Sequence, residues 1–166
     1  MHHQNIAKAR VVLTKVRTFY RSRQVIAYLK KINAYVMEEL VLTSLEDQGY
    51  SVKRSPTYSG DGGKDGETVI FGKRYFIQTK RYAEHISKGD IQKFIILCNK
   101  HNVRGLFVHT GKTGRHSKRE AEKATHIHII SGDNLVRLVR GQYFGINRSI
   151  PYILRSIFMG MVGKRK

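Results

Sequence analysis

A strand predicted over residues 74–82 carries two side chains whose types and spacing suit chemistry, Gln78 and Lys80. Successive side chains in a strand point to opposite faces, so Gln78 and Lys80 share one face. A hairpin partner that begins just after Asp65 would bring that carboxylate beside them, and the glycines around Asp65 permit close backbone approach. We therefore expect an acid, an amide oxygen and an ammonium group to converge.

Such a trio suits the hydrolysis of a phosphodiester bond. Mg²⁺ takes oxygen ligands and keeps several waters, so the expected ligands are the Asp65 carboxylate, the Gln78 amide oxygen, the Thr79 carbonyl and a phosphate oxygen. Lys80 would orient the attacking water and offset the negative charge that builds on the phosphate. Mn²⁺ is the alternative cation for a site of this kind.

Each of these residues also has a purely structural interpretation. Asp65 could shape a turn, Gln78 could be a surface residue of a strand, and Lys80 could be one more base in a basic protein. Asp61 is the rival candidate for the acid, although an aspartate in SGDGG more often shapes the turn through hydrogen bonds to its own backbone. The chemical interpretation depends on all of these residues occurring together.

The elements around this strand predict an α/β fold with a mixed sheet. Apolar residues recur at helical spacing from about residue 24 to residue 48, and Gly49 supplies a stop. Gly72 and Lys73 predict a hairpin turn into the strand of residues 74–82. The other expected elements are strands at 51–55, 68–72, 103–110 and 126–130, and helices at 87–100, 116–124 and 132–141. This order favours helices on both faces of the sheet.

Basic residues dominate the two ends of the chain. The sequence has 31 Lys and Arg against 12 Asp and Glu, a formal net charge of +19; residues 1–37 and 134–166 contain no acid. The expected organisation is a basic N-terminal arm or helix over residues 1–33, a compact body over 34–140 and a basic C-terminal extension over 141–166. Such ends could grip the phosphates of a nucleic acid, or they could be solvated tails.

Other classes of protein are disfavoured by composition. The 166 residues fit one domain, and no stretch reaches the roughly 18 apolar residues that a membrane span needs. Cys98 is the single cysteine, and no Cys/His set has the spacing of a zinc site, so a reducing cytoplasm is the expected location. The acid-free N-terminus also resembles an organellar transit peptide, but it continues without a break into the first expected helix.

The central part of the chain closely resembles the Mrr-type branch of the PD-(D/E)xK nuclease superfamily, in its Q-x-K variant. The resemblance covers roughly residues 34–140 and rests on MEELVLTSLEDQGY, GDGGKDG, FIQTKRY, GLFVHTG and IHIISGDNLVRLV. On the matching positions the family's catalytic aspartate is Asp65, its Q-x-K pair is Gln78 and Lys80, and its helical glutamate is Glu38. The resemblance implies a restriction-endonuclease-like fold, a Mg²⁺ requirement and endonucleolytic DNA cleavage.

Helical geometry independently favours Glu38 over Glu39. Glu38 lies three and seven residues before Val41 and Leu45 and so borders the inward face, whereas Glu39 is expected to point mostly to solvent. Gln78 replaces an acid of the broader superfamily pattern, which removes one negative charge from the metal site. Glu38 is therefore expected to matter more as a metal ligand, acting through water.

Six basic residues are the expected contacts to nucleic acid: Lys64, Arg81, Lys112, Arg115, Lys118 and Arg119. The last four occupy one loop, for which a solvated surface is an equally good interpretation. No helix-turn-helix or other separate reading module is evident, which favours weakly sequence-specific or structure-guided cutting. A homodimer would supply one site for each strand of a duplex.

Two alternative functions fit the same residues. A nuclease fold with basic arms could coat DNA or RNA by backbone contacts without catalysis, although the intact set of Asp65, Gln78 and Lys80 argues against this. Similar folds also resolve branched DNA junctions, which would change the substrate but not the chemistry.

Overall fold

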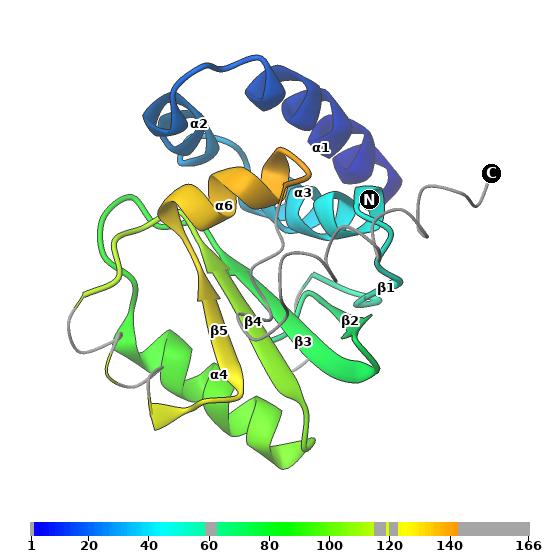
Figure 1. Ribbon diagram of the computed structural model, residues 1–166, viewed down its shortest axis with the longest axis vertical. Coiled ribbons are helices and arrows are strands. Elements are labelled where there is room, and N and C mark those ends of the chain that lie inside the picture. The colour runs from blue at the N-terminus through cyan, green and yellow to red at the C-terminus, as the bar shows by residue number, and fades with distance from the viewer. Residues whose placement is uncertain (1, 59–62, 115–118, 120–122, 143–166) are drawn as a thin grey trace, which may run out of the picture.

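The computed structural model describes residues 2–58, 63–114, 119 and 123–142, which form a five-stranded sheet flanked by helices (Figure 1). None of the described helices is long and apolar enough to cross a membrane. The helices and strands are α1 (His2–Arg17), α2 (Ser22–Leu29), α3 (Ala34–Asp47), β1 (Val52–Arg54), β2 (Gly66–Ile70), β3 (Lys73–Lys80), α4 (Lys88–Lys100), β4 (Arg104–His109), β5 (Ile127–Ile130) and α6 (Gly132–Val139).

The sheet is mixed, with strands in the order β1-β2-β3-β4-β5. β1, β2 and β3 pair antiparallel, whereas β3, β4 and β5 pair parallel. β2 and β3 are joined by a two-residue turn at Phe71 and Gly72, whose φ angles of 49° and 73° suit a turn that follows the twist of the strands. The hairpin is confirmed, one residue earlier than the sequence pattern placed its turn.

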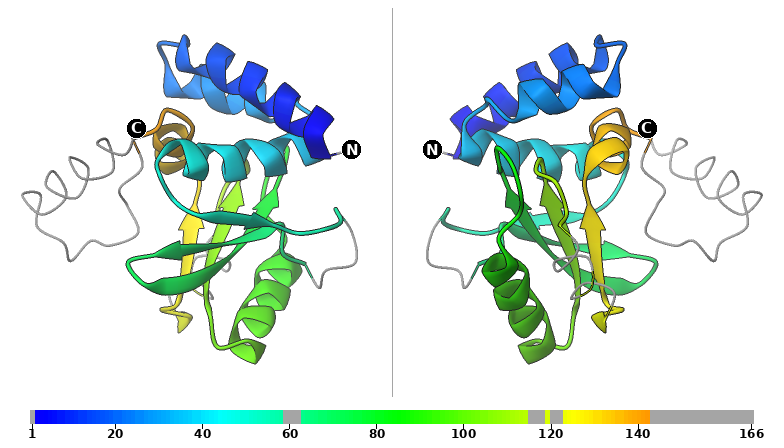
Figure 2. Two further views of the ribbon diagram at one scale, coloured as in Figure 1. Left: turned by 90° about the vertical axis from the view of Figure 1, so that its right-hand side faces the viewer. Right: turned by 90° about the vertical axis from the view of Figure 1, so that its left-hand side faces the viewer.

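Side chains of β3 alternate between two hydrophobic cores. Tyr75 and Ile77 pack into the core that includes α1, α2, α3 and α6, whereas Phe76 packs into the core that includes α4. Figure 2 shows α3 directly on the sheet, α1 and α2 as a further layer beyond it, and α4 on the other side. The predicted α/β architecture with helices on both faces is confirmed, and β3 is the central strand that links the two cores.

The single helix expected over residues 24–48 is wrong, because the structure breaks it into α2 and α3. Asn33 caps α3, and its side chain accepts hydrogen bonds from the backbone N–H groups of Tyr35 and Val36 at 2.9 and 3.4 Å. The apolar spacing continues through the break, so periodicity alone did not reveal it. The break allows α2 to turn away from the sheet and contact α6.

Some expectations fall outside the described residues. The helix expected over 116–124 lies there for the most part, and so do Asp61 and the C-terminal extension from residue 143 onward. At the N-terminus, α1 and α2 place Val16 and Leu29 in the same core as α3. The proposed division into arm, body and extension stays a prediction.

We predict that α1 is an integral part of this core. Val16 is 0% exposed and Val11, on the same helix, is 69% exposed. Val16→Ala should lower the free energy of unfolding by about 2 kcal/mol, because it removes two buried methyl groups and leaves a cavity. Val11→Ala is the matched control and should leave stability within about 0.5 kcal/mol of the unmodified protein. Equal effects in urea unfolding would show that α1 is not packed as described.

Candidate active site

Asp65 is held in place by backbone hydrogen bonds at the start of β2. Its N–H donates to the Ile77 carbonyl at 2.7 Å, and its own carbonyl accepts from the Ser55 N–H at 2.9 Å. Its side-chain Oδ2 accepts from the Thr79 N–H at 2.5 Å. The β2–β3 register therefore sets the carboxylate beside the end of β3, as the hairpin argument from the sequence expected.

Gln78 presents a free amide oxygen next to Asp65. Its Nε2 donates to the Gly63 carbonyl, which fixes which end of the amide faces the site. Its Oε1 is buried and has no hydrogen-bond partner among the residues that the structure describes. Gly63 has φ of +95°, and a Cβ at that position would lie 3.1 Å from Gln78 Nε2, so glycine suits both the backbone and the contact. A buried acceptor without a partner costs free energy unless another group satisfies it.

Asp65 is close enough to Glu38 for its charge to affect the ionisation of that glutamate. Burial raises the pKa of Glu38 to about 8, and the charge of Asp65 adds to the rise while Lys80 opposes it. Burial likewise raises the pKa of Asp65 to about 7, and the hydrogen bonds from Thr79 and the charge of Lys80 oppose that rise. The structure thus brings Glu38, Asp65 and Lys80 into one electrostatic cluster.

Lys80 and Gln78 line a cleft of about 300 Å³. The other lining residues are Gly63 from the loop before β2 and Asp90, Lys93 and Phe94 from α4. Phe94 is buried in the core, so the polar groups of the cleft are those of β3 and of the solvent-facing side of α4. This is a concave surface at which a phosphate could meet Gln78 and Lys80, whereas Asp65 and Glu38 are not among its described lining residues.

Glu39 does not point to solvent, so that part of the sequence argument was wrong. It is 1% exposed. Arg54 Nε donates to its Oε2 at 2.8 Å and the Tyr58 hydroxyl to its Oε1 at 3.0 Å, while His2 Nδ1 lies 2.7 Å from the same Oε1. Glu39 is buried because residues from other segments pack against it, which the spacing of apolar residues within α3 does not reveal. Glu38 is half-buried, and it remains the glutamate of α3 whose pKa is raised by the charge of Asp65.

The donor set fits a divalent cation. Within the described part of the chain, no group of three or more His, Cys, Asp or Glu side chains is arranged to hold a metal ion. The candidate donors are the Glu38 and Asp65 carboxylates and Gln78 Oε1, which is buried and has no hydrogen-bond partner among the described residues. Hard oxygen donors of this kind suit Mg²⁺ or Mn²⁺.

The predicted contacts to nucleic acid are scattered. Lys64 pairs with Glu67 at 2.5 Å, and Arg81 donates to the Lys30 carbonyl at 2.7 Å, so both already serve the fold. Lys112 and Arg119 are exposed. The remaining two, Arg115 and Lys118, lie outside the described residues. Their role in binding stays a prediction.

Sequence reasoning missed three residues near the cluster. Asp90 and Lys93 enter the cleft from α4, and Asp90 accepts a hydrogen bond from the Tyr82 hydroxyl. His109 pairs with Lys80 across the β3–β4 ladder, and burial lowers its pKa to about 4, which keeps the ring neutral. The sequence of α4 contained a pattern that could have identified Asp90 and Lys93, because each directly precedes a buried residue of the helix's apolar side.

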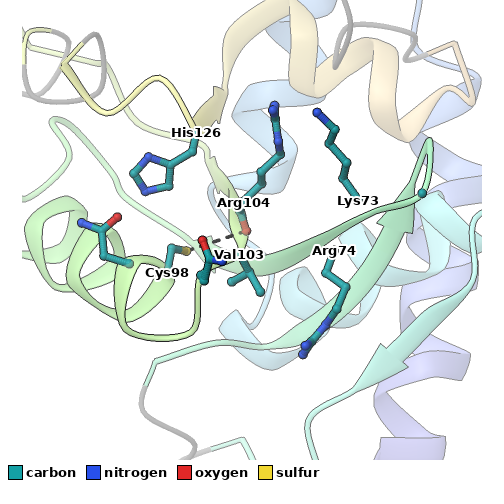
Figure 3. A pocket seen from close by; sticks show the side chains of 9 residues that line it. Lys73, Arg74, Cys98, Val103, Arg104 and His126 are labelled. Atoms are coloured by element: carbon teal, nitrogen blue, oxygen red, sulfur yellow. Dashed lines mark hydrogen bonds between the residues drawn. The ribbon is translucent and has the colours of Figure 1, made fainter.

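A second, larger pocket lies at the opposite end of the strands. It has a volume of about 620 Å³, and its wall includes Lys73, Arg74, Arg104 and His126. Figure 3 shows Lys73 and Arg104 pointing the same way while Arg74 points the other way. No acidic residue lines this pocket, so it lacks the carboxylates that the predicted chemistry requires.

A family model and a solved structure are similar to this chain. The family model Mrr_cat, described as a restriction endonuclease, matches residues 29–139. A solved structure of the MspJI restriction endonuclease in complex with a 27-mer oligonucleotide is similar over 94% of this chain, with 15% sequence identity and a TM-score of 0.47. The similar region is 34% of that protein's chain, so this chain spans about a third of its length. No curated protein sequence matches.

The matched region contains every element that builds the candidate site. Residues 29–139 include α3 with Glu38, the β2–β3 hairpin with Asp65, Gln78 and Lys80, and α4. The match covers well over half of the chain. The chain belongs to the Mrr-type restriction endonuclease family.

Proposed function

We propose that this protein is a metal-dependent DNA endonuclease whose active site is formed by Glu38, Asp65, Gln78 and Lys80. The observation that carries the proposal is the buried Gln78 Oε1, which has no hydrogen-bond partner among the described residues and belongs to the strand whose Thr79 N–H binds the Asp65 carboxylate. Membership of the restriction endonuclease family supports DNA as the substrate. The catalytic roles below belong to this proposal.

Asp65, Gln78 and Glu38 would hold the cation, with the Thr79 carbonyl as a further ligand and Glu38 acting through water. Asp65 keeps its position because Thr79 N–H binds one carboxylate oxygen. Gln78 keeps its oxygen toward the site because its Nε2 is bound to Gly63. Bound Mg²⁺ or Mn²⁺ would supply the positive charge that polarises the phosphate and makes water a better nucleophile.

Lys80 has the place and the charge to act on the reacting phosphate. It ends β3, lines the cleft, and lowers the pKa of both Glu38 and Asp65 through its positive charge. An ammonium group at this position orients the attacking water and stabilises the extra negative charge of the transition state. Because no separate reading module accompanies the site in the described residues, we propose weak sequence specificity or recognition of DNA structure.

Within the proposed function, the first prediction concerns cleavage. Lys80→Ala should reduce the rate of Mg²⁺-dependent cleavage of supercoiled plasmid, linear duplex and branched DNA by about 100-fold or more, because transition-state charge loses its partner. Lys100→Ala, on the exposed last turn of α4, is the matched control and should cut at the normal rate. Rates are followed by gel electrophoresis in Mg²⁺, in Mn²⁺ and in EDTA.

The same assay separates the competing functions. A protein that binds all three DNAs with a steep salt dependence but cuts none in either metal would be a binding module. Cutting confined to the branched substrate would identify a junction resolvase. Unchanged cutting by Lys80→Ala would remove Lys80 from the mechanism.

The second prediction concerns pH and stability. Unfolding returns the pKa values of Glu38 and Asp65 from about 8 and about 7 to 4.5 and 3.8, so the folded state binds more protons between these limits. The metal-free protein should therefore lose stability as pH rises through this range. Added Mg²⁺ should restore stability, most strongly above pH 8, where both carboxylates are charged.

Glu38→Gln tests this prediction directly. The variant removes one of the two charges, so above pH 8 its metal-free melting temperature should exceed that of the unmodified protein. Its gain from Mg²⁺ should be smaller. A pH-independent melting temperature for the unmodified protein, with no response to Mg²⁺, would contradict the proposed metal site.

A further inference from the structure

The first turn of α1 reaches the segment that leads to Asp65, although α1 lies outside the family-matched residues 29–139. α1 lies across α3 on the side away from the sheet (Figure 2), with Ala9, Leu13 and Val16 buried in the shared core. This packing places His2 and Asn5 at the end of α1 that adjoins residues 54–58. The N-terminal helix is therefore in contact with both halves of the candidate site, α3 and the loop before β2.

His2 makes two polar contacts with different segments. Its Nδ1 lies 2.7 Å from Glu39 Oε1 on α3, and its Nε2 lies 3.2 Å from the Pro56 carbonyl. Its ring also stacks on Tyr58, with a centroid distance of 4.3 Å. One side chain of α1 thus links the helix that carries Glu38 to the segment that precedes Asp65.

Asn5 and Tyr58 complete the link. Asn5 is buried, and its Nδ2 donates to the Tyr58 hydroxyl at 3.0 Å; that hydroxyl donates to Glu39 Oε1 at 3.0 Å. On its other side, Tyr58 lies against Tyr35 with a centroid distance of 4.5 Å. Tyr58 is therefore confined by two rings and two hydrogen bonds, and its position depends on α1.

The segment that contains Tyr58 is tied directly to the catalytic aspartate. Ser55 donates from its N–H to the Asp65 carbonyl at 2.9 Å and from its hydroxyl to the Lys64 carbonyl at 3.0 Å. Arg54, one residue earlier, binds the buried Glu39 at 2.8 Å. A displacement of residues 54–58 would consequently shift the backbone that holds Asp65.

We infer that His2 and Asn5 are positioning residues for the active site, which act by holding residues 54–58 and through them Asp65. This inference rests on the proposed function for its effect on catalysis, but its structural part does not. A misplaced catalytic group lowers the rate of the chemical step even when substrate still binds, so the effect belongs in kcat and not in KM.

The test uses the full chain with His2→Ala, Asn5→Ala and the double variant. His3→Ala is the matched control, because His3 is the exposed neighbour of His2 on the same helix. The double variant should lower kcat for Mg²⁺-dependent cleavage by about 10- to 100-fold, with KM for DNA within about twofold. His2→Gln keeps one donor and should recover part of the rate, which loss of folded protein would not explain.

Hydrogen exchange supplies a readout that does not depend on cleavage. In the double variant, the amides of residues 54–55, 57–58 and 63–66 should exchange faster, while those of β4, Arg104–His109, should keep their protection. Exchange and kcat both equal to those of His3→Ala would overturn the inference. If no form of the protein cleaves DNA, the proposed function fails, and the exchange result alone decides whether α1 positions the Asp65 segment.

Discussion

The carboxylates of Glu38 and Asp65 lie near the end of β3, where burial removes part of their hydration. Contacts around them limit the unfavourable free energy of this arrangement. Burial raises the pKa values of Glu38 and Asp65, and the charge of Asp65 adds to the rise at Glu38. Thr79 N–H and the charge of Lys80 oppose the rise but do not cancel it. The β2–β3 hairpin keeps the charges in place, because its register fixes Asp65 against Ile77 and Thr79. Such a cluster stores unfavourable electrostatic energy that a cation can release.

Glu38 and Glu39, the two neighbouring glutamates of α3, differ in the contacts that they make. Glu39 binds Arg54, Tyr58 and His2, and so it stabilises the contact between α3 and the segment before β2. Its charge also adds to the raised pKa values of Glu38 and Asp65. Among the described residues Glu38 has no comparable set of partners, and the charge of Asp65 adds to the rise in its pKa. A buried ion pair of the first kind fixes geometry, whereas an under-compensated carboxylate of the second kind is suited to bind a ligand.

The strong positive charge of the chain does not map simply onto a binding surface. Arg54 is used inside the fold against Glu39 and Glu46, Lys64 pairs with Glu67, and Arg81 and Lys30 tie α2 to the loop after β3. Each of these contacts lies within one chain and orders an element near the candidate site. Net charge therefore supports a polyanionic partner in general but does not identify the contacting residues.

Local sequence determined the parts of this protein that depend on short-range geometry. Alternation along β3 predicted that Gln78 and Lys80 share a face, and the hairpin predicted Asp65 beside them, because both follow from the period of a strand. Tertiary structure alone decided the burial of Glu39, since its partners His2, Arg54 and Tyr58 lie 37, 15 and 19 positions away. It also decided the entry of Asp90 and Lys93 into the cleft. The periodicity of a sequence shows which side of a helix is apolar. The helix α3, however, packs against the sheet on one side and against α1 on another. Only the folded chain brings these two packing partners together, so the sequence pattern could not predict that both sides are buried.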